Sequence, residues 1–389
     1  MLPPHLAHLP PPGAEAEALS IALQTHIRSG IAESGGWISF ARYMELALYA
    51  PGLGYYSAGS AKFGASGDFV TAPESSPLFA RCLASEVAPA IDLGNLDIVE
   101  VGAGSGALAA QMLQALEDLN VLPARYLILE VSADLRERQR SRIAHEVPHL
   151  AERVQWLDIL PATLNAVVIA NEVLDAIPTH RVHVRADGVD EIGVSIAPDG
   201  AAFVRSDRPA AGRLLATAVA LDLPQNYETE INLAMRAFVQ SLAVRISHGA
   251  MILIDYGYTA AEYYHPQRSS GTLMCHYRHH AHEDAFSLIG LQDITAHVDF
   301  TAVADAATQA GMSVLGYTTQ AQFLINTGIT QMLGETPADD VRTYAPLAAS
   351  VQKLLSPAKM GERFKVIALS RGVDVALPGF TRGDRTHTL

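Results

Sequence analysis

The chain has little cysteine, few positive charges and no long apolar run. Each of these absences argues against a class of protein. Only Cys82 and Cys275 are present, in no CxxC pair, which excludes a disulfide framework and fits a reducing compartment. Lysine and arginine number 27 against 41 acidic residues, a formal charge of -14 that disfavours nucleic acid and mildly favours a basic protein target. No apolar stretch approaches the roughly 18 residues that span a bilayer, so we expect a cytoplasmic protein.

What the chain does have is a composition suited to a large buried core. Of its 389 residues, 49% are hydrophobic and 17% are charged, which is typical of globular proteins and far from that of disordered chains. The length exceeds that of a usual single domain. We therefore expect one sheet-based domain with an appended or inserted part.

The N-terminal region divides into a tail and a helical part. Paired and tripled prolines in residues 1–18 predict a mobile tail without regular structure. Residues 19–49 carry apolar side chains at helical spacing, interrupted by glycines at 35–36. This pattern predicts two helices, with Ser39 as the N-cap of the second.

A long irregular segment follows, rich in glycine, serine, proline and aromatic residues. It covers residues 49–77, and a loop of this length in a compact protein is usually functional or disordered. Because its aromatic side chains have apolar faces to bury, we interpret it as an ordered loop that closes over a ligand, with a plain surface loop as the alternative. Gly67, Asp68 and Thr71 are the candidate ligand-binding residues on it.

From residue 97 onward, short β-branched runs alternate with helical stretches, a pattern typical of a parallel sheet covered on both faces. The predicted strands are 98–101, 126–130, 154–156, 166–170, 251–254 and 364–369. We therefore expect an α/β fold with these parts: a tail (1–18), a helical and loop region covering the ligand site (19–90), the core (91–180 and 246–375), an inserted hairpin with helices (181–245) and a C-terminal tail (376–389).

The first predicted strand runs directly into the glycine-rich turn of EVGAGSGAL. Gly102, Gly104 and Gly106 let the backbone turn sharply and approach a ligand, and the next helix presents free N–H groups to it. Glu130 ends the following strand, where a carboxylate can accept hydrogen bonds from both hydroxyls of a ribose. The turn alone fits S-adenosylmethionine and NAD equally, since it also matches the G-x-G-x-x-G/A fingerprint through Ala107.

Two later features favour the methyl donor. The fourth strand leads into NEVLDAIP, an acidic exit from Asn171 to Pro178 that suits a methyl acceptor. The last apolar segment, FKVIALSRG, stands almost at the C-terminus, as the final strand of a methyltransferase sheet does. The remaining cofactor-binding candidates are Asp158, Asn171 and Glu172.

Seven blocks of the sequence resemble the MidA-type methyltransferases over about residues 25–372. They are YMELALYAPGLGYY, KFGASGDFVTAPESSPLF, EVGAGSGAL, ANEVLDAIP, SSGTL, DITAHVDF and SPAKMGERFKVIALSRG, in this order. The family includes the mitochondrial complex I assembly-factor arginine methyltransferase and its bacterial relatives. The resemblance implies a class I, Rossmann-like methyltransferase sheet, S-adenosylmethionine as donor and, for the mitochondrial member, dimethylation of an arginine in a complex I subunit. The family turn commonly reads GPGRGTL, so Ser105 stands here in place of an arginine.

For catalysis we single out Glu172 and Asp175, which we expect to hold a substrate guanidinium, and His297. A histidine two residues from Asp299 could orient substrate or relay a proton, and a strand edge that satisfies nearby backbone is the alternative. A noncatalytic assembly chaperone and a nicotinamide-dependent oxidoreductase remain the competing functions. We expect no metal site, because the stretch CHYRHHAH at 275–282 has poor ligand spacing and is interpreted as a polar loop.

Overall fold

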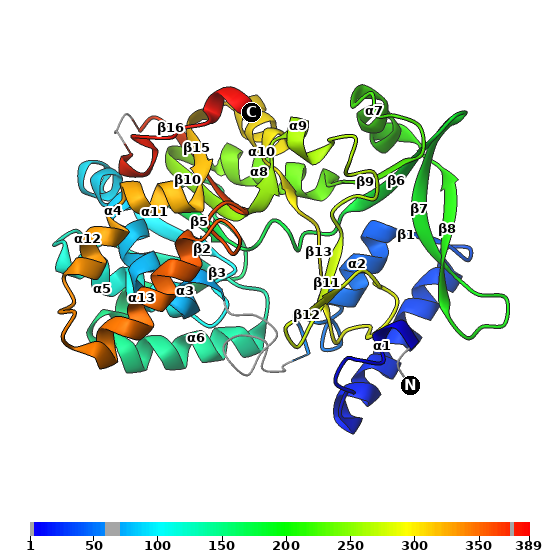
Figure 1. Ribbon diagram of the computed structural model, residues 1–389, viewed down its shortest axis with the longest axis horizontal. Helices are drawn as coiled ribbons and strands as arrows, with labels where there is room; N and C mark the ends of the chain where they lie inside the picture. The colour runs from blue at the N-terminus through cyan, green and yellow to red at the C-terminus, as the bar shows by residue number, and fades with distance from the viewer. Residues whose placement is uncertain (1–3, 59–70, 374–376) are drawn as a thin grey trace. The chain divides into compact units, whose positions relative to one another are not determined.

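The computed structural model describes residues 4–58, 71–373 and 377–389, which group into two compact units (Figure 1). The first, called here the sheet unit, takes its described residues from 70–174, 238–259 and 298–389. The second, called here the antiparallel unit, takes its described residues from 1–69, 175–237 and 260–297. Each unit is therefore assembled from three separate stretches of chain.

The sheet unit contains an eight-stranded, mainly parallel sheet. Its order is β15-β16-β10-β5-β2-β3-β4, with β14 beside β10. The strands are β2 (Asp97–Val101), β3 (Tyr126–Leu129), β4 (Val154–Leu157), β5 (Leu164–Asn171), β10 (Ile246–Tyr258), β14 (Val298–Asp299), β15 (Ser313–Thr319) and β16 (Phe364–Arg371). All six strands predicted from the sequence are present. β16 runs antiparallel to both β10 and β15, whereas β2, β3, β4, β5 and β10 run parallel to their neighbours in this set.

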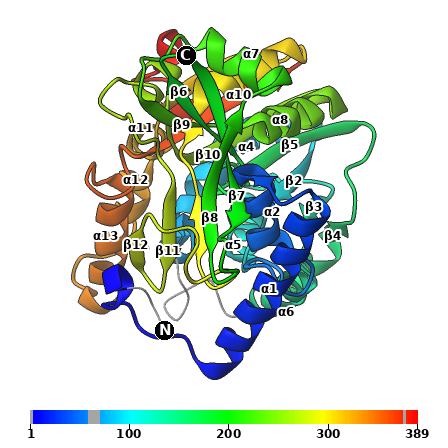
Figure 2. The same cartoon turned by 90° about the vertical axis from the view of Figure 1, so that its right-hand side faces the viewer.

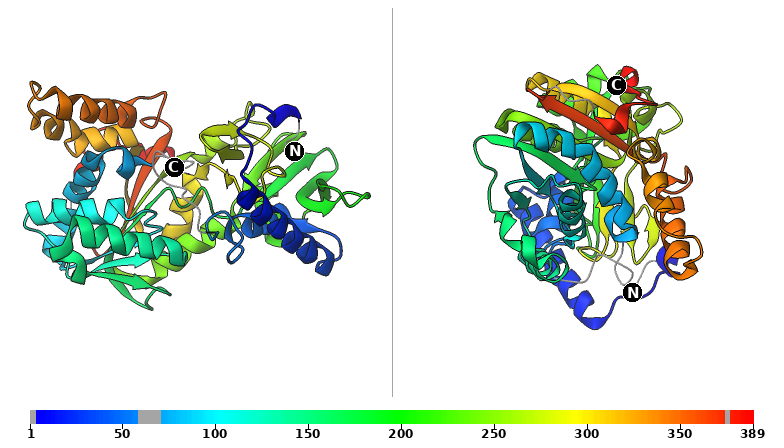
Figure 3. Two further views of the ribbon diagram at one scale, coloured as in Figure 1. Left: turned by 90° about the horizontal axis from the view of Figure 1, so that it is seen from below. Right: turned by 90° about the vertical axis from the view of Figure 1, so that its left-hand side faces the viewer.

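Helices cover this sheet. They are α3 (Ala72–Ser75), α4 (Pro77–Gly94), α5 (Ala107–Asp118), α6 (Ala133–Glu146), α10 (Phe300–Gln309), α11 (Gln320–Asn326), α12 (Ile329–Gly334) and α13 (Val341–Leu355), while α8 (Leu233–Arg245) leads into β10. Neighbouring helices α4 and α5, and then α5 and α6, are in contact, as the view from below shows (Figure 3). The parallel strands and their helices form the α/β architecture that the alternating pattern predicts.

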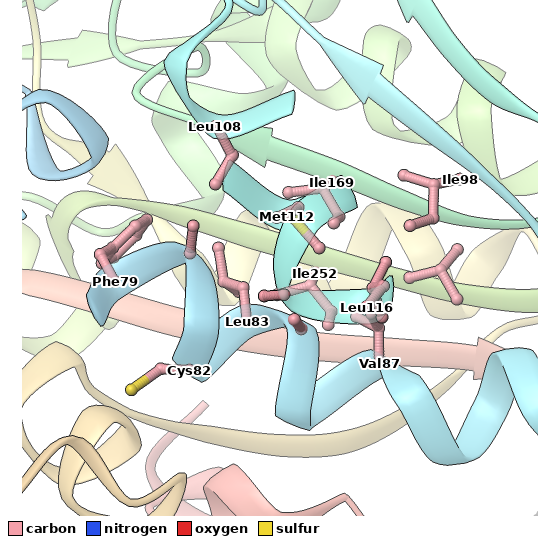
Figure 4. Packing of buried hydrophobic residues seen from close by; sticks show 14 of the residues in the cluster. Phe79, Cys82, Leu83, Val87, Ile98, Leu108, Met112, Leu116, Ile169 and Ile252 are labelled. Carbon is pink, nitrogen blue, oxygen red and sulfur yellow. The ribbon is translucent and has the colours of Figure 1, made fainter. Parts of the chain in front are cut away.

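The core of the sheet unit follows from helical and strand periodicity. Helix α4 presents Phe79, Leu83 and Val87 at spacings of four, and α5 presents Leu108 and Met112 in the same way (Figure 4). These side chains pack against isoleucines of the strands, namely Ile98, Ile169 and Ile252. Alternate strand residues such as Val99, Val168 and Leu253 point to the opposite face and are equally buried, so both faces of the sheet are covered.

The antiparallel unit contains two smaller sheets. One has the order β1-β7-β6-β9 with β8 beside β7, and the other has the order β12-β11-β13. Strands β7 and β8 lie side by side in Figure 2. The strands are β1 (Ile38–Ser39), β6 (His180–Arg185), β7 (Gly188–Ile196), β8 (Phe203–Pro209), β9 (Tyr227–Ile231), β11 (Met274–Tyr277), β12 (His280–His282) and β13 (Asp293–Thr295). Its helices are α1 (Ala14–Glu33), α2 (Phe40–Tyr49), α7 (Gly212–Ala220) and α9 (Ala260–Tyr263).

Local signals at the start of this unit are confirmed. α1 and α2 are separated by Gly35 and Gly36, both with positive φ, and the Ser39 side chain accepts a hydrogen bond from Arg42 N at the start of α2. The predicted hairpin after residue 180 is β6 with β7. In the structure, β1 pairs with β7, and α4 packs on the other sheet. Helices α1 and α2 and strands β6 to β9 therefore belong to one unit.

Residues 1–18, expected to form a mobile tail without regular structure, contain a short 3-10 helix at Pro4–Leu6 and the start of α1. Leu6 and Leu9 are buried against Tyr277 and Leu288, because even a proline-rich segment orders when it carries apolar side chains that find a core. At the other end, the Asp384 side chain accepts a hydrogen bond from Tyr317 N at 2.9 Å on the edge strand β15. Residues 275–282 are also ordered, as the hairpin β11–β12 instead of a loop.

No helix among the described residues is both long and apolar enough to cross a membrane.

Candidate functional site

The glycine turn between β2 and α5 has a backbone that only glycine adopts easily. Gly102, Gly104 and Gly106 have φ of 66°, 53° and 82°, in the left-handed region. Space is short as well. A Cβ on Gly102 would lie 3.0 Å from a methyl of Val173, and one on Gly106 would lie 3.1 Å from Cα of Gln139. The turn is therefore fixed by both conformation and packing.

Gln139 of α6 holds this turn and was missed by the sequence analysis. Its side chain is fully buried, and Nε2 donates to the backbone oxygen of Gly104 at 2.9 Å and to Glu130 Oε2 at 3.2 Å. Its Oε1 accepts from Trp156 Nε1 at 2.8 Å. A signal was present, because Gln139 is the one polar residue in a buried row at spacing four that also contains Leu135 and Ile143.

Glu130 lies just beyond the end of β3, as predicted, and is almost completely buried. Burial raises the pKa of its carboxyl, while hydrogen bonds from Ser132 N and Gln139 and the charge of Arg136 oppose the rise. An ionised carboxylate can accept about four hydrogen bonds, and those from Val131 N, Ser132 N and Gln139 do not use all of this capacity. The remaining capacity is what a ribose hydroxyl needs.

Two apolar side chains stand exposed beside Glu130. Val131 follows it after β3 and is 80% exposed, and Ile159 follows Asp158 after β4 and is 81% exposed. Since β3 and β4 are parallel neighbours, all four residues lie at the same edge of the sheet. Asp158 is itself exposed and paired with Arg136 at 2.7 Å. Exposed apolar surface next to two carboxylates suits a flat, polar-edged ring such as a purine.

The exit of β5 is held in an unusual conformation. Glu172 has φ of 56°, which is strained for a residue with a side chain. Its Oε1 accepts hydrogen bonds from Asn171 Nδ2 at 3.0 Å and from Ala72 N at 3.4 Å. The buried carboxylate of Asp255 fixes the following residues by accepting from the backbone N–H groups of Val173 and Leu174. Asp255 thus acts as scaffold for this exit.

An unsatisfied polar atom lies at the same exit. Asn171 Oδ1 is buried and has no hydrogen-bond partner among the described residues. Buried polar atoms are normally paired, so an orphan next to a glycine turn fits a site that receives a ligand donor. The methionyl amino group of S-adenosylmethionine is a donor of this kind.

A buried acid on β2, Glu100, was also missed. It accepts a hydrogen bond from the Tyr126 hydroxyl at 2.7 Å. Burial raises the pKa of the Glu100 carboxyl to about 7, with the Tyr126 hydrogen bond opposing and the charge of Glu130 reinforcing the rise. Its position two residues before Gly102 could have marked it, because a charged residue rarely stands inside a buried strand without a role.

A family described as "Putative S-adenosyl-L-methionine-dependent methyltransferase" matches residues 79–318 of the chain. The chain belongs to this methyltransferase family. S-adenosylmethionine is accordingly its cofactor, as predicted, and the nicotinamide alternative that the turn left open is set aside. The matched range contains the glycine turn, Glu130 and the β5 exit.

Relatives of this methyltransferase resemble it over most of their length. The mitochondrial protein arginine methyltransferase NDUFAF7 of Danio rerio is 30% identical over 91% of this chain and 88% of its own. The corresponding protein of Bos taurus is 30% identical over 87% of this chain and 81% of its own. A crystal structure from Burkholderia thailandensis, bound to S-adenosyl-homocysteine, is 52% identical, covers 98% of this chain and 100% of its own, and has a TM-score of 0.95. The predicted class I methyltransferase sheet is thereby confirmed.

The other predicted site residues of the methyltransferase fall into different places. Asp175 and His297 belong to the antiparallel unit. Asp175 is buried and its carbonyl accepts from Ala296 N, and His297 N donates to Thr272 Oγ1 at 3.1 Å. Asp299 belongs to the sheet unit, where its side chain caps α10 by accepting from Ala302 N at 3.0 Å.

Of the three candidates on the long loop, the structure places one. Thr71 directly precedes α3 in the N-cap position. Gly67 and Asp68 lie outside the described residues. Cys275, the first residue of the histidine-rich stretch, is buried in β11, and the described residues contain no group of three or more His, Cys, Asp or Glu that could hold a metal ion.

Proposed function

We propose that this methyltransferase transfers a methyl group to an arginine side chain of a protein substrate, with a respiratory complex I subunit as the first candidate. The observation that carries the proposal is the strained, anchored carboxylate of Glu172 at the β5 exit. Strain of this kind costs about 1 to 3 kcal/mol and persists mainly at functional sites. The names of the NDUFAF7 relatives and the net charge of -14 support a basic protein substrate.

The residues that would hold the cofactor surround one end of the sheet. We assign the methionyl part to the turn of Gly102, Gly104 and Gly106 and to Asn171, whose orphan Oδ1 would accept from the amino group. The ribose hydroxyls are assigned to Glu130. A second set of residues, Val131, Ile159 and Asp158, would contact the adenine. When bound, S-adenosylmethionine supplies an electrophilic methyl group on a sulfonium sulfur.

Arginine is a difficult nucleophile because it stays protonated in proteins, with a pKa above about 12. A carboxylate can match the planar guanidinium with two hydrogen bonds and draw positive charge away from the attacking nitrogen. In the transfer, that nitrogen forms a bond to the methyl carbon as the carbon–sulfur bond breaks, and a proton then leaves the nitrogen. We assign the carboxylate role to Glu172. Asp175 and His297, which belong to the antiparallel unit, stay candidates from the sequence for a second carboxylate and a proton acceptor.

The test is Glu172→Gln, which is nearly isosteric and uncharged, assayed for methyl transfer to a candidate complex I subunit beside a titration with S-adenosylhomocysteine. We expect transfer to fall at least about tenfold with binding retained, because a charge-assisted contact made in the transition state is lost. Glu137→Gln, on the exposed side of α6, is the matched control. Transfer at the wild-type rate would contradict the assignment, and lost binding would place Glu172 in the donor site.

The same assay separates an enzyme from a noncatalytic assembly chaperone. A chaperone that kept the fold would bind S-adenosylhomocysteine, yet the wild-type protein would transfer no methyl group to any candidate subunit. The intact glycine turn favours the enzyme. For location we propose the cytoplasm, since Cys82 and Cys275 are both free and buried, which suits a reducing compartment.

A further inference from the structure

Helix α3 is only four residues long, yet each residue is tied to a different part of the sheet unit. Ala72 N donates to Glu172 at the β5 exit, and Pro73 O accepts from Gln111 Nε2 of α5 at 3.2 Å. Glu74 pairs with Arg142 of α6, and Ser75 Oγ accepts from Lys353 Nζ of α13 at 3.2 Å. So short a helix gains little from its own hydrogen bonds, so these ties fix its place.

The strongest of the four is a cluster of Glu74, Ser105 and Arg142. Arg142 Nη1 lies 2.6 Å from Glu74 Oε1 and 2.5 Å from Ser105 Oγ, and Ser105 Oγ also bonds to the Glu74 carboxylate. The Arg142 and Glu74 side chains are 28% and 16% exposed. Partial burial weakens solvent screening, so this pair is worth more than an exposed ion pair.

The protonation of the cluster agrees with its geometry. Burial works against ionisation of Glu74, but hydrogen bonds from Arg142 and Ser105, together with the Arg142 charge, outweigh it and lower the pKa. Glu74 is therefore an anion at neutral pH, held by one cation. Arg142 has a second acid in reach, Glu146, at 3.0 Å from its Nε, which keeps the guanidinium oriented toward the turn.

The cluster joins the two sides of the site. Ser105 is part of the glycine turn, between Gly104 and Gly106. The hydrogen bond that its hydroxyl accepts from Arg142 of α6 therefore holds the turn in place. Glu74 lies two residues after Ala72, whose N–H bonds to Glu172. One guanidinium thus contacts the cofactor turn directly and reaches the β5 exit through α3.

We propose that Arg142 is a positioning residue of this methyltransferase, which holds the cofactor turn through Ser105 and helix α3 through Glu74. The role of Arg142 at the turn is tested by cofactor binding alone. Its role in placing Glu172 rests on the proposed function. A surface ion pair that merely adds stability would leave cofactor affinity unchanged when removed.

The first experiment is calorimetric titration of Arg142→Ala with S-adenosylhomocysteine. We expect about tenfold weaker binding, or about 1.4 kcal/mol, because hydrogen bonds to charged groups are lost. Glu74→Gln should weaken binding similarly, and the double variant should be no worse than either single one. The matched control is Arg125→Ala, which breaks an Arg–Asp pair with Asp97 at the opposite end of β2 and should stay within about twofold of wild type.

The decisive experiment moves the positive charge from position 142 to position 105. Ser105 Oγ bonds to Glu74 already, so an arginine at position 105 can bring its guanidinium to the same carboxylate. We expect Ser105→Arg to restore most of the affinity lost in Arg142→Ala. Rescue would exclude a purely local packing role for Arg142, since the new side chain comes from another element.

Two results would overturn the proposal: wild-type affinity in folded Arg142→Ala, or a folded Ser105→Arg, Arg142→Ala protein that binds no better than the single variant. Glu74→Gln keeps the test open if Arg142→Ala does not fold, because it leaves the arginine stem in place. The titration needs no methyl acceptor. A wild-type protein that binds S-adenosylhomocysteine but methylates no arginine therefore refutes the proposed function and leaves the role of Arg142 standing.

Discussion

The side-chain amide of Gln139 donates a hydrogen bond to the backbone oxygen of Gly104, with Nε2 and O 2.9 Å apart. The same nitrogen reaches Glu130, so one buried side chain joins the cofactor turn to the proposed ribose acceptor. Because a buried amide without partners costs free energy, this bridge keeps both groups in place before any ligand arrives. The turn and Glu130 should therefore behave as a prearranged pair, and substitution of either should affect binding more than folding.

Gly104→Val should abolish binding of S-adenosylhomocysteine while leaving most of the fold intact. Its φ of 53° is costly for a β-branched residue, by about 1 to 2 kcal/mol, and the new side chain would occupy ligand space. Gly200→Val is the control, because Gly200 has φ of 73° in an open turn of the antiparallel unit. The unfolding temperature should fall by similar amounts in both variants, and only Gly104→Val should lose the binding of S-adenosylhomocysteine. Wild-type affinity in Gly104→Val would contradict the assignment of the glycine turn to the cofactor.

Glu130→Ala should weaken binding of S-adenosylhomocysteine by about 1 to 3 kcal/mol, the range for hydrogen bonds to a charged group. Calorimetry measures this directly. Glu137→Ala serves as the control and should bind as wild type does, because Glu137 is an exposed acid of α6 that pairs with Arg140 at 3.6 Å. Unchanged affinity in Glu130→Ala would contradict the assignment of Glu130 to the ribose hydroxyls.

Glu86 of α4 should make stability fall as pH rises. Burial raises the pKa of its carboxyl to about 7, although a hydrogen bond from Gly379 N at 2.6 Å opposes the rise. Because the folded state holds the proton more tightly than the unfolded chain, this contribution is complete below about pH 4.5 and is lost by about pH 7. The loss amounts to at most about 3 kcal/mol.

The check is urea unfolding of wild type and Glu86→Gln between pH 5 and 8. The variant cannot ionise at this position, so its stability should decline less over this interval. Glu100, which shifts in the same direction, is present in both proteins, so the difference between them isolates Glu86. Parallel curves would show that Glu86 does not titrate in this range.

The sequence by itself determined the features that depend on neighbouring residues. Short apolar runs specified β2, β3, β5, β10 and β16, since a strand buried on both faces needs mainly apolar side chains. A shorter run specified β4, which lies at the edge of the sheet. The glycines at 102, 104 and 106 specified the turn, and Ser39 the start of α2, because backbone conformation and capping are local properties. The family resemblance predicted S-adenosylmethionine as the methyl donor.

Tertiary structure alone decided which distant polar groups meet. Nothing in the spacing of Glu74, Ser105 and Arg142 joins them, since 31 and 37 residues separate Ser105 from the other two. The union of β1 with β7, and the burial of Leu6 and Leu9, were likewise invisible in the sequence. Hydrophobic burial has a period that a sequence displays, whereas a hydrogen bond between two elements depends on where the whole chain has placed both of them.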